Sequence, residues 1–503
     1  MGKRMAWLPM LLVWGLCGSC SSPRTVVIVQ QTQPSSLDPH WANETVVWST
    51  LSNVVEGLVR FSPQLELEPA LAVRWQQEGP TVWRFTLRSG VLFHHGKPLT
   101  AQDVVASFQR AQRHPRSQVS HFLSGVTRVE AVGDGEVLLV TDGPAPTLLR
   151  RLSFVLVLPQ EQCGEEEVLV PLGTGPYRVT EREDHALELQ ATRWWGGQVS
   201  LRRARMIFVE DDTERTRLFA AGEADVATWL READVAELRR HPELRVKQQP
   251  RLAVQLLAII PRAASGEAAR ALADVRVRRA LHYALNRQRL VEEVARGEAT
   301  VASQLVHPLV FGYDPTLEPL PYDPGKARQL LVQAGVREGL EVTLGIAPGA
   351  VETGERIAQD WAQVGVRVSL KVLSFSELLA ATRAGRLPVV FFARTCTTSD
   401  ASEVLEPHTH CPDPPRGLGV ENYPQLCDPQ VDRFLEAAAT ELDLERRRVL
   451  LQQAQKRVLE HSYYLPLLIR WSYLGLRKPL DVQPRYDQFL FLPNFTLTPE
   501  RQA

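Results

Sequence analysis

Two periodicities alternate along this chain, and this alternation limits the possible folds more than any other feature. Trp83, Phe85 and Leu87 repeat at every second residue, which is typical of a strand with one buried face. Val277 and Leu281 are four residues apart, the spacing of one face of a helix. We expect strands at 25–29, 83–87, 137–140, 366–372 and 387–392, and helices at 100–111, 275–296, 323–331 and 377–383. The alternation predicts an α/β fold with at least two lobes.

The first twenty residues have the layout of a lipoprotein signal peptide. The cationic pair Lys3–Arg4 precedes an apolar run at 5–16, and two small residues stand directly before Cys20. A transmembrane anchor is the alternative, but a spanning helix needs about 20 apolar residues. We therefore predict that residues 1–19 are removed. Cys20 then carries a lipid that anchors the protein to a membrane in the periplasm or another extracytoplasmic space.

The size and charge of the chain after the signal peptide limit its number of domains and its class of partner. Removing 19 of the 503 residues leaves 484, which is more than one hydrophobic core usually supports. The 57 basic and 58 acidic side chains give a net charge of −1, which indicates no nucleic-acid partner. After Cys20 the longest apolar run, 252–261, is typical of a buried strand. We expect a monomeric body of two or three domains.

Four cysteines remain when the signal peptide and Cys20 are set aside. Cys411 and Cys427 flank a loop rich in proline and glycine, which can bend back and bring their sulfur atoms together. We predict a disulfide between them, because the extracytoplasmic space is oxidising. Cys163 and Cys396 are expected to be free, buried thiols.

The sequence carries no motif of an enzyme or of a resident cofactor. A nucleophile elbow, a zinc-binding His-Glu-x-x-His, a phosphate loop and a dinucleotide fingerprint are all absent from it. His408, His410 and Cys411 lie close together, but their spacing matches no closed zinc site. We predict no metal site, no cofactor and no catalytic activity.

Several longer motifs follow one another in the order typical of one family. They lie at 36–40, 55–59, 90–104, 173–177, 277–281, 322–324 and 360–366, and the strongest is Gly-Val-Leu-Phe-His-His-Gly-Lys-Pro-Leu-Thr-Ala-Gln-Asp-Val at 90–104. With these motifs the chain resembles the extracellular solute-binding protein family 5. This family comprises substrate-binding proteins of peptide-type ABC transporters, with dipeptide-, oligopeptide- and nickel-binding members.

The resemblance implies the large form of the type II periplasmic-binding-protein fold. Two α/β lobes would be joined by a two-strand hinge and would close on a ligand between them. Lobe I would comprise 20–249, with an extra subdomain at about 41–171. Lobe II would comprise 250–469, and residues 470–503 would return into lobe I.

The resemblance also implies where a ligand would bind. In peptide-binding relatives, an aspartate on a loop after a buried strand pairs with the α-amine of the peptide. Without gaps, the relatives' Gly-Trp-Thr-Gly-Asp pattern places Arg394 at the tryptophan and Thr397 at the aspartate. Asp400 follows three residues later and would pair with the amine only if the loop is shifted. The competing interpretation is that Asp400 caps a helix or forms a turn.

The arginine that binds the peptide carboxylate in dipeptide-binding relatives is also replaced. Val351 and Glu352 stand at its place, and Arg356 lies one helical turn later. Both contacts to a free dipeptide are thus altered, which leaves longer peptides, held by backbone hydrogen bonds, compatible with the scaffold.

The predicted function is capture of peptides and their delivery to an ABC permease and its ATPase. Two alternatives keep the same fold: binding of another solute such as nickel or haem, and a sensor that reports its ligand to a partner protein.

Overall fold

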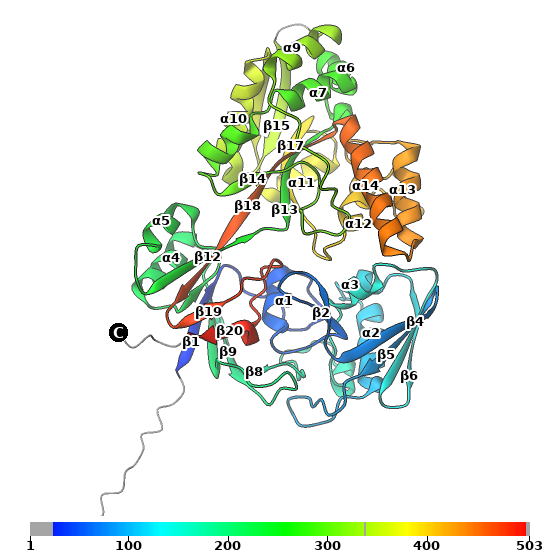
Figure 1. Cartoon of the computed structure of the whole chain (residues 1–503), viewed down its shortest axis with the longest axis vertical. Helices are drawn as coiled ribbons and strands as arrows, with labels where there is room; N and C mark the ends of the chain where they lie inside the picture. The colour runs from blue at the N-terminus through cyan, green and yellow to red at the C-terminus, as the bar shows by residue number, and fades with distance from the viewer. Residues whose placement is uncertain (1–23, 337–338, 499–503) are drawn as a thin grey trace, which may run out of the picture.

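The computed structural model describes residues 24–336 and 339–498 (Figure 1). The predicted signal peptide and the predicted lipid site at Cys20 lie outside these ranges. Within them, no helix is both long enough and apolar enough to cross a membrane.

One long strand, β18 (Tyr464–Arg477), runs through both lobes of the molecule (Figure 1). Its first half pairs with β13 (Ala253–Ile259) and β14 (Ala299–Val301), and its second half pairs with β12 (Leu244–Pro250). Because β12 leads directly into β13, two strands connect the lobes. This arrangement confirms the predicted two-lobed α/β fold with a two-strand hinge.

Lobe I is built on the part of the sheet ordered β11-β1-β10-β9-β8. The central strand β1 pairs in parallel with β10 and β11, and β9 and β8 continue the sheet in antiparallel fashion. The elements are β1 (Thr25–Gln30), α1 (Thr45–Leu51), β8 (Tyr177–Glu183), β9 (Ala186–Ala191), β10 (Arg203–Phe208), α4 (Asp212–Ala221), β11 (Val226–Ala227) and α5 (Val235–Leu238).

A separate four-stranded antiparallel sheet, ordered β4-β5-β7-β6, lies beside this lobe. It comprises β4 (Ala72–Gly79), β5 (Val82–Leu87), β6 (Val126–Val132) and β7 (Glu136–Thr141), with α2 (Ala101–Arg113) and α3 (Leu148–Leu152). Trp83, Phe85 and Leu87 on β5 are buried, as their alternation predicted. The predicted start of α2 is also confirmed, because Thr100 and Asp103 form a capping box.

Lobe II surrounds the strands β16-β15-β17-β13. Its elements are α6 (Gly266–Ala273), α7 (Val275–Tyr283), α9 (Pro324–Gln333), β15 (Leu340–Ile346), α10 (Val351–Ala362), β16 (Val366–Val372), α11 (Phe375–Arg383), β17 (Val389–Thr395), α12 (Ser402–Thr409), α13 (Pro429–Thr440) and α14 (Leu444–His461). In Figure 1 the helices α12, α13 and α14 lie on the side of this lobe away from β14.

The prediction of one helix over 275–296 is wrong. Helix α7 ends at Tyr283, and the short α8 (Arg287–Arg289) and a π-turn follow. The cause lies 74 residues later, because the buried Asp360 carboxylate accepts the backbone N–H of Asn286 at 2.9 Å. The side chain of Asn286 then caps the next turn, where its oxygen accepts the N–H of Arg289 at 2.9 Å.

We propose the lobe boundaries 20–249, 250–469 and 470–503, with the extra subdomain at about 41–171. The packing of the apolar cores supports the division between the two lobes, while Val47, Leu51 and Val54 pack in the core of lobe I and not in a separate subdomain core. Leu474, Leu476 and Phe495 pack in the same core as Ile28 of β1, whereas residues 465–468 of β18 pack in the core of lobe II.

Candidate ligand-binding cleft

A cavity of about 690 Å³ lies between the two lobes beside the hinge. Lobe I lines it with the residues that follow β1 and β11 and with the start of α4. The beginning of β13 and the middle of β18 line the opposite side. The lining includes Trp229 and eight charged residues, which are Glu210, Asp211, Asp212, Arg215, Arg231, Glu232, Arg251 and Arg470. Because most of the lining residues are charged, a ligand in this cavity meets fixed charges.

Three of the four arginines in this lining have acceptors within the protein. Arg215 donates to two backbone carbonyl oxygens at 2.7 and 2.8 Å. Arg231 forms a two-pronged pair with the Asp234 carboxylate, with both distances 2.8 Å. Arg470 donates to one carboxylate oxygen of Glu232 at 2.5 Å. Arg231 and Arg470 are therefore paired with carboxylates, whereas Arg215 donates only to backbone carbonyl oxygens, including that of Trp229 at 3.2 Å.

The fourth arginine, Arg251, is different. In the part of the chain that the structure describes, its buried Nε has no hydrogen-bond partner, and no carboxylate lies within ion-pair distance of its guanidinium. The guanidinium instead lies over the ring of Trp229, 4.5 Å from the ring centre. Burial and the neighbouring charge of Arg470 lower the pKa of Arg251 to about 10. Arg251 is thus a cation at neutral pH without an anionic partner.

Trp229 is held in a strained backbone conformation, with φ at +54°. A bulky residue rarely adopts this left-handed region, and such strain is concentrated at functional sites. Trp229 lines both the interlobe cavity and an adjoining cavity of about 290 Å³ in lobe I.

Arg394 lies near the end of β17, and the loop after β17 carries two more of the predicted ligand-binding residues, Thr397 and the more deeply buried Asp400. The Asp400 carboxylate accepts two hydrogen bonds from Arg447 of α14, at 2.6 and 2.8 Å, and one from the backbone N–H of Ser402 at 3.1 Å. Burial would raise the pKa of Asp400, but the hydrogen bonds and charge of Arg447 outweigh it and lower the pKa. Asp400 therefore accepts a hydrogen bond from Ser402, the first residue of α12, and neutralises Arg447, and its role as an amine partner stays a prediction.

The other predicted ligand residues lie in three different surroundings. Thr397 donates its backbone N–H to Glu403 at 3.0 Å, and Arg394 pairs with Glu421 at 3.0 Å. Arg356 lies apart from the loop, on α10, where it pairs with Glu293 at 2.9 Å. None of these three, nor Asp400, lines the 690 Å³ cavity. Their roles in ligand binding stay predictions.

The lobes touch at the end of the cleft away from the hinge. Arg150 of α3 in lobe I donates to the carbonyl oxygen of Thr398 in lobe II at 3.3 Å. Its guanidinium also lies 5.8 Å from the ring centre of Phe61 and 5.9 Å from that of Phe311. Figure 1 shows α3 and α12 facing each other at this point. The cleft is therefore bounded by the hinge at one end and by this contact at the other.

Sequence reasoning missed Arg150, Trp229 and Arg251. The only local signal was that Arg251 is a charged residue directly before the long apolar run at 252–261. The strain at Trp229 and the contact of Arg150 become visible only when segments far apart in the chain are brought together.

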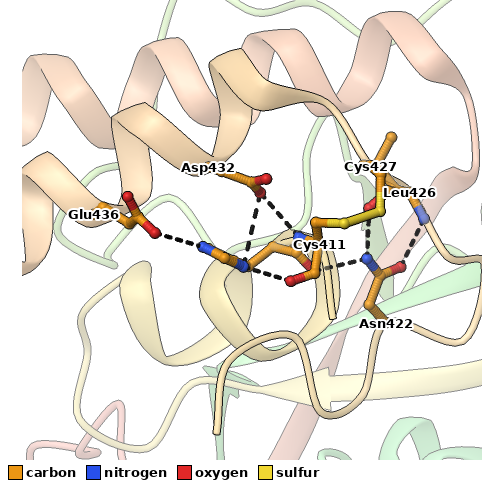
Figure 2. Close-up of a disulfide and its surroundings, with 7 residues drawn as sticks. Cys411, Asn422, Leu426, Cys427, Asp432 and Glu436 are labelled. Carbon is orange, nitrogen blue, oxygen red and sulfur yellow. Dashed lines mark hydrogen bonds and ion pairs between the residues drawn. A yellow bond between two sulfur atoms is a disulfide. The ribbon is translucent and has the colours of Figure 1, made fainter. Parts of the chain in front are cut away.

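Cys411 and Cys427, the pair that the sequence predicted, are joined by a disulfide, and Cys163 and Cys396 are free thiols. Cys396 is buried as expected, whereas Cys163 is only half-buried. Figure 2 shows how the closed loop is held. The Asn422 amide donates to the carbonyl oxygens of His410 and Leu426 at 2.8 and 2.7 Å, and Asp432 accepts the N–H of Cys411 at 2.9 Å. Within the described ranges, no group of three or more His, Cys, Asp or Glu side chains could hold a metal ion.

Removal of this disulfide is expected to destabilise the protein. The bridge closes a loop with a sequence separation of 16 residues, so the double variant Cys411→Ala, Cys427→Ala should lose about 3 kcal/mol of unfolding free energy. Urea unfolding of the two proteins measures the difference. Cys163→Ala, which removes a free thiol, is the control, and equal unfolding midpoints for the wild type and the double variant would contradict the prediction.

A two-lobed α/β body with a two-strand hinge and an interlobe cavity defines a ligand-binding protein of the periplasmic-binding-protein class. The particular family follows from sequence comparison. The chain belongs to the bacterial extracellular solute-binding proteins, family 5, because the model of the middle region of this family matches residues 66–415. This confirms the resemblance found in the motifs.

Individual relatives are similar over nearly the whole chain. Heme-binding protein A of Haemophilus influenzae is 28% identical over 89% of this chain and 87% of its own length. Di/tripeptide-binding protein 2 of Pseudomonas aeruginosa is 27% identical over 89% of this chain and 90% of its own. The solved structure of HbpA2 from Haemophilus parasuis matches with a TM-score of 0.83 at 27% identity, covering 94% of this chain and 100% of its own.

Proposed function

We propose that this protein captures peptides between its lobes and delivers them to an ABC permease and its ATPase. The observation that carries the proposal is the 690 Å³ cavity between hinged lobes in a member of family 5. Relatives named for di- and tripeptide binding support peptides as the ligand class. The substrate is held and released without chemical change.

The lipid anchor at Cys20 belongs to the same proposal. An anchored, monomeric receptor in the extracytoplasmic space stays close to its permease, which raises the effective concentration of captured ligand there. The sequence before Cys20 supports this part of the proposal.

Peptides are expected to raise the melting temperature of the purified protein, because a ligand that binds only the folded state stabilises it. The measurement is a thermal-shift screen with peptides of two to eight residues, alongside haem and nickel–histidine as competing ligands. Stabilisation by peptides supports the proposal. Stabilisation by haem or nickel–histidine alone would replace peptides with that solute, as the relative named for heme binding suggests.

A further inference from the structure

Of the four arginines that line the interlobe cavity, Arg251 alone has a side chain without a hydrogen-bond acceptor among the residues that the structure describes. Arg215, Arg231 and Arg470 have carbonyl or carboxylate acceptors, whereas Arg251 has none among the residues described. A desolvated cation without a partner destabilises a folded protein, since burial removes water without replacing its hydrogen bonds. A partner supplied by a ligand would remove this penalty.

The surroundings of Arg251 favour a particular kind of anion. Its guanidinium is supported on one side by the ring of Trp229 at 4.5 Å, which leaves the edge with its N–H groups for a ligand. The planar edge of a guanidinium matches a carboxylate, which it binds with two parallel hydrogen bonds.

Glu232 sets a second requirement. One of its oxygens accepts from Arg470, while the buried Oε1 has no hydrogen-bond partner within the described residues. Glu232 lines the same cavity as Arg251. A carboxylate beside the site disfavours ligands with high negative charge, such as a phosphate, and it can accept an N–H from the ligand. The last residue of a peptide carries a carboxylate and an amide N–H on the same Cα.

We propose that Arg251 is the residue that binds a carboxylate of the ligand, with Trp229 positioning its guanidinium and Glu232 accepting a neighbouring N–H. This assignment rests on the proposed function and specifies its substrates as peptides with a carboxylate near the hinge. It assigns the anion to a residue other than Val351 and Glu352, which occupy the positions where dipeptide-binding relatives are expected to hold it, and Gly349, just before them, lines the same cavity.

The test compares matched peptide pools of three to five residues by isothermal titration calorimetry. One pool has free carboxyl termini, a second has C-terminal amides, and a third has C-terminal amides with one glutamate side chain. Amidation should weaken binding to the wild type by roughly tenfold to a hundredfold, the range for loss of a charge-assisted pair in a closed site. Arg251→Gln should weaken binding of the free acids by a similar factor and remove the difference between acids and amides.

Arg231→Gln is the matched control, because Arg231 lines the same cavity but is compensated by Asp234. It should keep the preference for the free acids. Recovery of affinity by the glutamate pool, lost again in Arg251→Gln, supports the proposal with a side-chain carboxylate as the bound group. Equal binding of acids and amides by the wild type overturns the assignment of Arg251 but leaves peptide binding intact. Absence of binding by every pool overturns the proposed function and the assignment with it.

Thermal unfolding of the unliganded proteins separates a binding role from a structural one. Because no described residue accepts a hydrogen bond from the Arg251 side chain, Arg251→Gln should melt at the same temperature as the wild type or higher. A clear decrease in its melting temperature would assign Arg251 to holding the lobes together and would overturn the proposal.

Discussion

Asp400→Ala is expected to lower the free energy of unfolding by about 3–5 kcal/mol, because it leaves the buried Arg447 without its partner. Both side chains are almost fully buried, with exposed fractions of 2% for Asp400 and 1% for Arg447. The substitution also removes the acceptor for Ser402 at the start of α12. Urea unfolding of the unliganded protein measures the loss.

The double variant Asp400→Leu, Arg447→Met is the control for this prediction. It removes both charges together, and buried ion pairs replaced by apolar residues of similar size often cost little. Its stability should therefore lie above that of Asp400→Ala. An Asp400→Ala protein within about 1 kcal/mol of the wild type would contradict the expectation, since it would mean that Arg447 finds water or another acceptor.

The pH dependence of this pair has a definite sign. The pKa of Asp400 is lowered in the folded protein from its usual 3.8. Its contribution to stability is therefore complete above the pKa of the unfolded chain and is lost as the pH falls through the lower, folded pKa. Between pH 5 and 8 the contribution of Asp400 should be constant. The pH dependence of the unfolding free energy should therefore differ between the wild type and the double variant only below about pH 4.

Local sequence patterns predicted most of the fold, because the burial of one face of a strand or helix makes apolar residues repeat every two to four positions. Phe85 and Leu87 alternate on β5 since one face of that sheet is covered, and this cause is visible within six residues. The predicted helix over 275–296 failed for the opposite reason. The acceptor that interrupts it, Asp360, is far away in sequence, and only the folded chain places it beside Asn286.

The cleft was less predictable than the fold for the same reason. Asp400 could be selected from its loop as a candidate, but its partner Arg447 lies 47 residues later. The sequence shows many arginines, and nothing local distinguishes Arg251 from Arg231. The difference is that Asp234 lies three residues from Arg231, while the described part of the fold brings no acceptor to Arg251.

The motif at 173–177 shows that a glycine can be required by close packing of the backbone and not by its own φ angle. In the structure Gly173 does not have a positive φ, whereas Gly90 and Gly96 do. A Cβ on Gly173 would lie 1.8 Å from the carbonyl oxygen of Val54. The motif therefore requires glycine because two backbone segments are in contact there.

Gly173→Ala is consequently expected to destabilise the protein by about 3 kcal/mol or more, the upper end of what overpacking costs. The clash is with backbone atoms, which cannot move aside as a flexible side chain can. The same segment is also held by hydrogen bonds, from the N–H of Gly175 to Val54 at 3.0 Å and from the N–H of His94 to Gly173 at 2.9 Å. Relief of the clash would therefore break the hydrogen bonds that hold this segment against Val54 and His94.

Gly164→Ala is the matched control, because a Cβ at Gly164 would meet no atom within 4 Å. Urea unfolding should give Gly164→Ala a midpoint close to that of the wild type and Gly173→Ala a much lower one, or no folded protein at all. Equal unfolding midpoints for the two alanine variants would mean that the backbone at Val54 can shift to make room for the Cβ. The contact with Val54 would then not explain why the motif has a glycine at 173.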